Sequence, residues 1–367
     1  MRLTRGLMSS LVAASVLVAG CGTAPSSPPA RPEDVRSRIA GLMPPTVADR
    51  PGWALDIYAA FDALRIEPNL SNTCAVLAVI EQESTYRADP QVPGLGKLAR
   101  EEIDRRAERA GVPQLLVQAA LNLRSPDSRT WNERINAARS EKELSNLFED
   151  FISEVPLGQR FFAGYNPVRT GGPMQVGVEY AQAQVKARPY PYRMAGSVRD
   201  EVFSRRGGLY FGIAHLLDYP AGYDRPIYRF ADFNAGQYAS RNAAFQSAVS
   251  TLAGVTLDLD GDLVAPGSDA TRPGSTESAV RSLGPRLGMR DDEIRRALQQ
   301  ETQPAFEQTR LWTRVFELAD AAARRPVPRA VLPRIRLSSP KITRPLTTEW
   351  FARRVDERYQ RCRGQNG

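Results

Sequence analysis

Histidine is the scarcest informative residue, because the 367 residues contain a single one, His215. A zinc site built from several histidines is therefore excluded. A Ser-His-Asp hydrolase would have to use His215 as its base. This residue lies in the apolar stretch Leu209–Leu217, whose composition is typical of a helix. The setting favours a packed helix residue over a catalyst.

Cysteine is also scarce, with Cys21, Cys74 and Cys362 as the three examples. If Cys21 is modified as argued below, Cys74 and Cys362 remain, and an oxidising compartment allows them to pair. Such a disulfide would tie the C-terminal tail to the apolar stretch at Cys74 and would close a very long loop, which stabilises a fold. The alternative is one buried thiol and one free thiol in the tail. We expect the disulfide.

Long apolar runs are missing after the first twenty residues, so we expect no later segment to span a membrane. The early run, Leu7–Val18, follows Arg2 and Arg5 and is too short to span a bilayer comfortably. A charged start followed by a short apolar run is typical of a signal peptide. We therefore assign residues 1–20 to a signal peptide.

The end of this run, Val18-Ala-Gly-Cys21, resembles the bacterial lipobox. The resemblance implies that Cys21 becomes the lipidated first residue of the mature protein and carries palmitate or a similar acyl chain. The residue after Cys21 is Gly22 and not an acidic residue. In Gram-negative lipoproteins this pattern implies sorting to the outer membrane, facing the periplasm. The alternative is an ordinary signal peptide that leaves a soluble protein.

Acidic residues are outnumbered, and the net charge is +8. Removing residues 1–20 deletes two arginines and no acids, which leaves 8 − 2 = +6. An exported protein rarely meets nucleic acid, so we expect no nucleic-acid partner. The anionic partners in the envelope are lipid headgroups and the carboxylates of peptidoglycan. A surface that is basic only for solubility is the alternative.

The mature chain is dominated by helical periodicity and predicts a mainly α protein. The alternation around Asp-Gly in residues 255–264 predicts one small β-hairpin. The same aspartates suggest a calcium loop, but their spacing is wrong for one, so we expect no metal. The expected organisation is a flexible tether over 21–35 and a domain over 36–265 with a helical insertion at about 90–160. A C-terminal helical region with a basic, proline-rich tail over 277–367 is expected to pack on this domain.

Three separated segments belong together: Val79–Tyr86 (VIEQESTY), Gly171–Val176 (GGPMQV) and Phe230–Gly236 (FADFNAG). Their order and type resemble the lytic transglycosylases and goose-type lysozymes. That superfamily has a Glu-Ser pair that ends a buried helix, then a Gly-Leu-Met-Gln turn, then a Tyr-Asn-Ala-Gly segment. The likeness covers residues 70–90 and 165–250 and implies a lysozyme-like fold.

Glu83 is the candidate acid/base on physical grounds alone. Cleavage of a glycosidic bond needs a proton donor at the bridging oxygen. Glu83 follows the apolar stretch from Cys74 to Ile80, and burial there would raise its pKa and keep it protonated. Glu81 is the competitor, but residues two apart on a helix point to different sides. The alternative is that Glu83 is an ordinary solvated helix-end residue.

The resemblance implies that the single carboxylate of Glu83 cleaves peptidoglycan between N-acetylmuramic acid and N-acetylglucosamine. It would leave 1,6-anhydromuramic ends without a cofactor. Met174 and Gln175 would line the cleft, Asn234 would bind sugar or orient the acid, and Ser84 would support the helix end or the substrate. Met174 as core packing and Asn234 as a helix cap are the alternatives.

Three departures from the family pattern are present, and two of them, Phe233 and the unusually long stretch between Ser84 and Gly172, favour a second hypothesis. Pro173 replaces the leucine before Met-Gln, and Phe233 replaces the tyrosine before Asn-Ala-Gly. The lost hydroxyl would weaken positioning of the acid unless Tyr238 or Tyr228 replaces it. The second hypothesis is a non-catalytic envelope lipoprotein that binds peptidoglycan or a cell-wall enzyme through the groove, with Phe233 in its wall.

Overall fold

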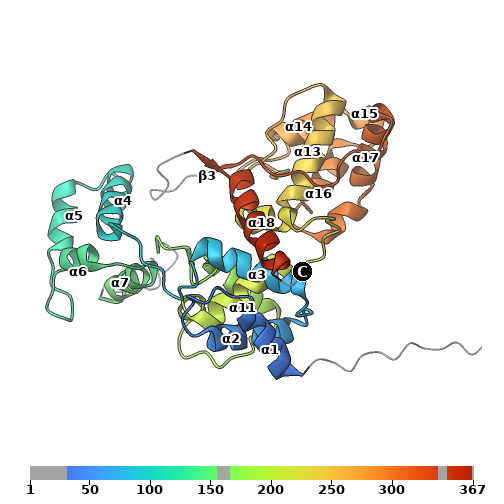
Figure 1. Cartoon of the computed structure of the whole chain (residues 1–367). Coiled ribbons are helices and arrows are strands. Elements are labelled where there is room, and N and C mark those ends of the chain that lie inside the picture. The colour runs from blue at the N-terminus through green and yellow to red at the C-terminus, as the bar shows by residue number, and fades with distance from the viewer. Residues whose placement is uncertain (1–30, 155–165, 338–344, 366–367) are drawn as a thin grey trace, which may run out of the picture.

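The computed structural model describes residues 31–154, 166–337 and 345–365 (Figure 1). Helices make up most of these residues, and the strands among them form two short antiparallel pairs. The prediction of a mainly α protein is confirmed. No helix in the described ranges is long and apolar enough to cross a membrane. The predicted signal peptide and lipidated Cys21 lie outside them.

The body of the protein is built around α3 (Leu70–Glu83). Every residue of α3 from Thr73 to Ile80 is buried, because this helix is apolar on all sides and neighbours surround it. The other body helices share one core with α3. They are α1 (Pro32–Gly41), α2 (Arg50–Leu64), α9 (Val178–Ala187), α10 (Val198–Val202), α11 (Arg205–Leu217), α12 (Ile227–Ala235) and α18 (Thr348–Gly364). Since α1 begins at Pro32, the predicted tether over 21–35 is too long at its C-terminal end.

The body also carries a tight two-stranded turn. β1 (Thr170–Gly171) pairs antiparallel with β2 (Val176–Gly177), and α9 follows at once. Residues 172–175 form the loop of this hairpin, at the motif where the resemblance implied a turn; the two strands were not predicted. A hairpin forms here because Gly172, with φ +73°, adopts the left-handed conformation that glycine tolerates.

A group of helices leaves the body after α3 and forms the insertion (Figure 1). Within the described residues, four helices belong to it. They are α4 (Leu95–Arg109), α5 (Gln114–Leu121), α6 (Trp131–Ala137) and α7 (Glu141–Glu154). These helices share a small apolar core of their own around Val117, Leu121 and Trp131. The predicted helical segment at about 90–160 corresponds to them within the described residues.

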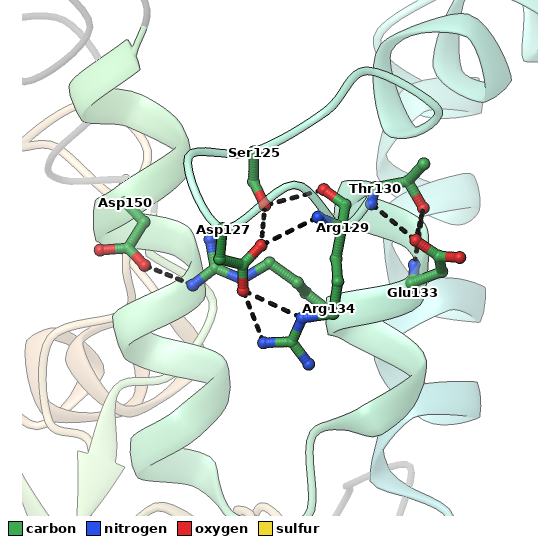
Figure 2. A network of polar contacts seen from close by, with 7 residues as sticks. All are labelled: Ser125, Asp127, Arg129, Thr130, Glu133, Arg134 and Asp150. Carbon is green, nitrogen blue, oxygen red and sulfur yellow. Dashed lines mark hydrogen bonds and ion pairs between the residues drawn. The ribbon is translucent and has the colours of Figure 1, made fainter.

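Charged side chains hold the insertion together where its core is small (Figure 2). The Asp127 carboxylate accepts hydrogen bonds from Ser125 Oγ at 2.6 Å and from the Arg129 guanidinium at 2.6 Å, which closes the turn before α6. Arg134 of α6 donates to Asp150 of α7 at 2.5 Å. The second contact of Arg134, with Asp127 at 3.6 Å, joins the turn to the same pair.

A second apolar core lies among the helices that come between α12 and α18 in the chain. They are α13 (Ala239–Ala253), α14 (Ser275–Ser282), α15 (Gly284–Leu287), α16 (Asp291–Leu298), the 3-10 helix η2 (Pro304–Gln308) and α17 (Arg310–Ala323). Glu277 in this group is fully buried and pairs with Arg281 at 2.5 Å and Arg295 at 2.6 Å. The predicted boundary at residue 265 is corrected, because the buried residues of α13 pack with α14 and α17.

The β-hairpin predicted for residues 255–264 is wrong, because this segment is an irregular loop. Side chains satisfy its backbone in place of a partner strand. The Gly261 N–H donates to Gln246 Oε1 at 2.9 Å, and the N–H groups of Leu263 and Val264 both donate to the Glu301 carboxylate. The alternation that suggested a strand reflects two buried leucines in the loop, Leu257 and Leu263.

The C-terminal helix α18 returns to the body and packs on α3 and α12 (Figure 1). A short pair, β3 (Arg336–Leu337) with β4 (Leu346–Thr347), precedes it. The disulfide between Cys74 and Cys362 joins α18 to α3, so the predicted pairing is confirmed. The last helix therefore belongs to the body, although it was predicted to share a region with residues 277–324.

Candidate functional site

A cavity of ≈ 1190 Å³ lies between the body and the insertion. The body contributes Glu83, Gln175, His215, Phe233 and Asn234 to its wall, and the insertion contributes apolar side chains from α4 to α7. Four of the predicted site residues thus line a single cavity although the chain separates them widely. The remaining two, Ser84 and Met174, lie behind this wall.

Glu83 is the last residue of α3 and is half-buried. The chain leaves the helix sharply, because Thr85 and Tyr86 both adopt left-handed backbone conformations, with φ of 52° and 58°. Such conformations in residues other than glycine are strained and recur at functional sites. Tyr86 folds back onto the helix, where its hydroxyl donates to the Leu77 carbonyl at 3.3 Å. The turn holds Glu83 at the end of a rigid, buried helix.

The rival carboxylate, Glu81, faces α18. Its Oε1 accepts a hydrogen bond from Arg361 at 2.9 Å and lies 3.3 Å from the Arg358 guanidinium. Glu81 does not contribute to the cavity wall. The prediction that Glu81 and Glu83 face different sides of the helix is confirmed, and Glu81 serves to bind the C-terminal helix.

Gln175 reaches the cavity from the β1–β2 loop. It adopts a left-handed backbone conformation, with φ 50°. Its side-chain Nε2 donates to the Gly172 carbonyl at 3.3 Å, and its backbone N–H donates to the same carbonyl at 3.1 Å. Thr170 Oγ1 donates to Gln175 Oε1 at 3.4 Å. These bonds fix the orientation of the amide at the cavity wall.

Asn234 is held from the far end of the chain. Thr348 Oγ1, in the first turn of α18, donates to Asn234 Oδ1 at 3.1 Å, and Thr348 itself is fully buried. With its oxygen engaged, the Asn234 amide can offer N–H donors to a ligand. The C-terminal helix therefore determines how a residue of the cavity wall presents its hydrogen-bonding groups.

Asp232, which the sequence analysis did not single out, fixes the segment around Asn234. Its buried carboxylate accepts hydrogen bonds from the hydroxyls of Tyr219 at 3.0 Å and Tyr223 at 2.6 Å. The backbone N–H groups of Tyr238 and Ser240 donate to it at 3.0 and 2.6 Å. The sequence signal for this residue was an aspartate two positions before Asn-Ala-Gly, ahead of a helix, where a carboxylate can accept hydrogen bonds from backbone N–H groups.

His215 also lines the cavity, between the rings of Tyr180 and Phe233. Its Nε2 lies 3.3 Å from the Phe233 carbonyl and can only donate there, so Nδ1 is the unprotonated nitrogen. Nδ1 is buried and has no hydrogen-bond partner among the described residues. Burial lowers the pKa of His215 to about 4 and keeps the ring neutral. It is both a packed helix residue and a hydrogen-bond acceptor beside the site.

Ser84 and Met174 support the site from behind. Ser84 Oγ donates to the Ile80 carbonyl at 3.0 Å, which matches the helix-end role among its two predicted roles. Met174 is fully buried and packs against Gly212 of α11, as its alternative assignment to the core describes. Direct contact of either side chain with a substrate stays a prediction.

Glu102 and Glu141 are further carboxylates in the cavity wall, both contributed by the insertion. Arg106 donates to Glu102 at 2.7 Å, and this hydrogen bond lowers the pKa of the carboxyl group. Glu102 is therefore an anion near neutral pH and a poor proton donor. No group of metal-binding side chains occurs among the described residues.

The fold and the cavity define a class: a disulfide-bonded, mainly α-helical protein in which a body and a helical insertion line one large cavity. The chain belongs to the family described as "Protein of unknown function (DUF1615)", which it matches over residues 46–365. It is 53% identical over 362 residues to the uncharacterized protein YaiW of Escherichia coli K12, with 98% of each chain covered. No solved structure matches the chain.

Proposed function

We propose that this protein is a lipid-anchored peptidoglycan lytic transglycosylase with a lysozyme-like body and Glu83 as its acid/base. One observation carries the proposal. Glu83, Gln175 and Asn234, from three segments far apart in the sequence, line the same cavity. These are the segments whose order resembles the transglycosylases, and a chance resemblance gives no reason for them to meet.

In the proposed reaction the Glu83 carboxyl group protonates the oxygen that bridges N-acetylmuramic acid and N-acetylglucosamine. The bond from that oxygen to the muramic C1 breaks. The resulting carboxylate then takes the proton of the muramic 6-hydroxyl group, whose oxygen bonds to C1. Gln175 and Asn234 hold the sugar by hydrogen bonds. The products are a free N-acetylglucosamine end and a 1,6-anhydromuramic end, and no water is consumed.

The test is digestion of purified sacculi by the wild type and by Glu83→Gln. We expect anhydro-ended muropeptides from the wild type and a loss of about a hundredfold or more in Glu83→Gln, the range typical of a missing general acid. Glu81→Gln is the matched control, because Glu81 lies on the same helix and faces α18. Equal losses in both variants would show that Glu83 has no special role.

A second candidate function is non-catalytic binding of peptidoglycan or a cell-wall enzyme through the same cavity. The observation that favours it is Phe233 in the cavity wall, where a tyrosine hydroxyl would help to position an acid. Wild-type protein that binds sacculi and releases no muropeptide would establish this function and exclude the first.

A further inference from the structure

The body and the insertion contribute chemically different walls to the cavity. The body contributes the polar side chains of Glu83, Gln175, His215 and Asn234, and the insertion contributes three charged side chains, Glu102, Arg106 and Glu141. Most of the insertion wall is nevertheless aliphatic and comes from α4, α5 and α7. Its principal members are Leu98, Ile103, Leu116, Val117, Leu121 and Leu144. A ligand that fills the cavity must therefore be apolar over much of its length.

The aliphatic side chains of this wall offer no hydrogen-bond partners. Water needs two to four polar partners, and a peptide backbone must satisfy its N–H and C=O groups. The ring of Trp131 is 4% exposed, with Arg134 over it at 4.9 Å and Phe151 at 5.3 Å, so its faces are already covered. An aliphatic chain has no polar group to satisfy there.

The rim of the cavity is apolar as well. Val112 and Leu116 line the cavity and are also 41% and 58% exposed. Leu115 and Leu123 beside them are 79% and 62% exposed. Four of the seven exposed large hydrophobic side chains of the described residues thus gather in residues 112–123, at one edge of the cavity. Exposed apolar groups that cluster in this way mark a binding surface.

We propose that the cavity binds the long aliphatic chain of an amphiphile, which enters past the exposed rim at α5 and meets the polar body with its other end. The volume of ≈ 1190 Å³ exceeds the range of about 300–1,000 Å³ usual for drug-sized ligands, so a long chain fits better than a small apolar molecule. Chain binding does not depend on glycan cleavage, because the aliphatic wall belongs to the insertion and Glu83 belongs to the body.

Two neighbouring alanines of α5 allow a matched test. Ala120 lines the cavity, whereas Ala119 is exposed and does not. We expect dansyl-labelled undecanoic acid to bind the purified chain with a rise in fluorescence. Ala120→Trp fills the cavity and should weaken binding by about tenfold or more, while Ala119→Trp should leave it nearly unchanged. Binding is measured without peptidoglycan, so its failure is distinguishable from a failure of the proposed function, which is read from the release of muropeptides.

Competing ligands identify which kind of molecule supplies the aliphatic chain. Displacement of the probe by free palmitate alone indicates a fatty acid, and displacement also by phosphatidylethanolamine–phosphatidylglycerol vesicles indicates a membrane lipid; both support the inference. Failure of the wild type to bind, or equal weakening in both alanine variants, overturns it. If Ala120→Trp does not fold, Leu116→Glu at the rim and Gln118→Glu provide the same comparison, because Gln118 is exposed on the same helix and does not line the cavity. We expect loss of binding for Leu116→Glu only.

Discussion

His215 is the residue whose charge depends most clearly on the fold. Burial lowers its pKa to about 4, whereas an unfolded chain restores the ordinary value of about 6.5. Between these values the unfolded chain takes up a proton that the folded protein does not. The contribution of His215 to the free energy of unfolding is therefore complete above about pH 6.5 and is lost as the pH falls toward about 4.

His215→Gln should remove this dependence. A glutamine retains an N–H donor toward the Phe233 carbonyl and does not titrate. We expect the wild type to lose up to about 3 kcal/mol more than the variant between about pH 7 and about pH 4. Urea unfolding at several pH values measures the difference, in which the carboxylates common to both proteins cancel. Parallel profiles would show that His215 is not held in its neutral form.

The β1–β2 loop positions Gln175, and Gly172 decides whether this loop can form. Gly172 has φ +73°, and a Cβ atom there would lie 2.1 Å from the Val202 carbonyl oxygen. Because backbone cannot move aside easily, we expect Gly172→Ala to lower the free energy of unfolding by at least about 2 kcal/mol. Chemical denaturation checks this value.

Gly177, at the end of the same hairpin, provides the control. Its φ is −67°, and a Cβ atom there would meet nothing closer than 3.8 Å. Gly177→Ala should therefore be tolerated with little change in stability. A similar loss in the two variants would indicate that the whole hairpin, and not the conformation of Gly172, is sensitive to added bulk.

The disulfide joins α3 to the C-terminal helix α18, and Cys74 and Cys362 are 288 residues apart in the sequence. Closing so long a loop restricts the unfolded state, and we expect Cys362→Ser to lower the free energy of unfolding by about 3–5 kcal/mol. Denaturation with and without reductant measures the effect. Reductant should destabilise the wild type and leave Cys362→Ser unchanged; destabilisation of both would show that the reductant acts elsewhere.

Features that depend on neighbours in the chain were predicted well. The buried helix α3 follows from its unbroken apolar composition, and the opposite directions of Glu81 and Glu83 follow from helix geometry. The prediction failed at residues 255–264, where Gln246 and Glu301 take the place of a partner strand. Gln246 and Glu301 lie outside this segment, so the pattern within the segment could not indicate their hydrogen bonds to it.

By itself, the sequence determined the mainly helical fold and the different directions of Glu81 and Glu83, because periodicity acts locally. It also determined the Cys74–Cys362 pairing, and with it the return of the C-terminal segment to α3, because two cysteines remain once Cys21 is set aside. Only the tertiary structure decided that Thr348 engages Asn234 and that the insertion lines the cavity with a mostly aliphatic wall. These contacts join segments through packing, and the burial that rewards them exists only once the whole chain has folded.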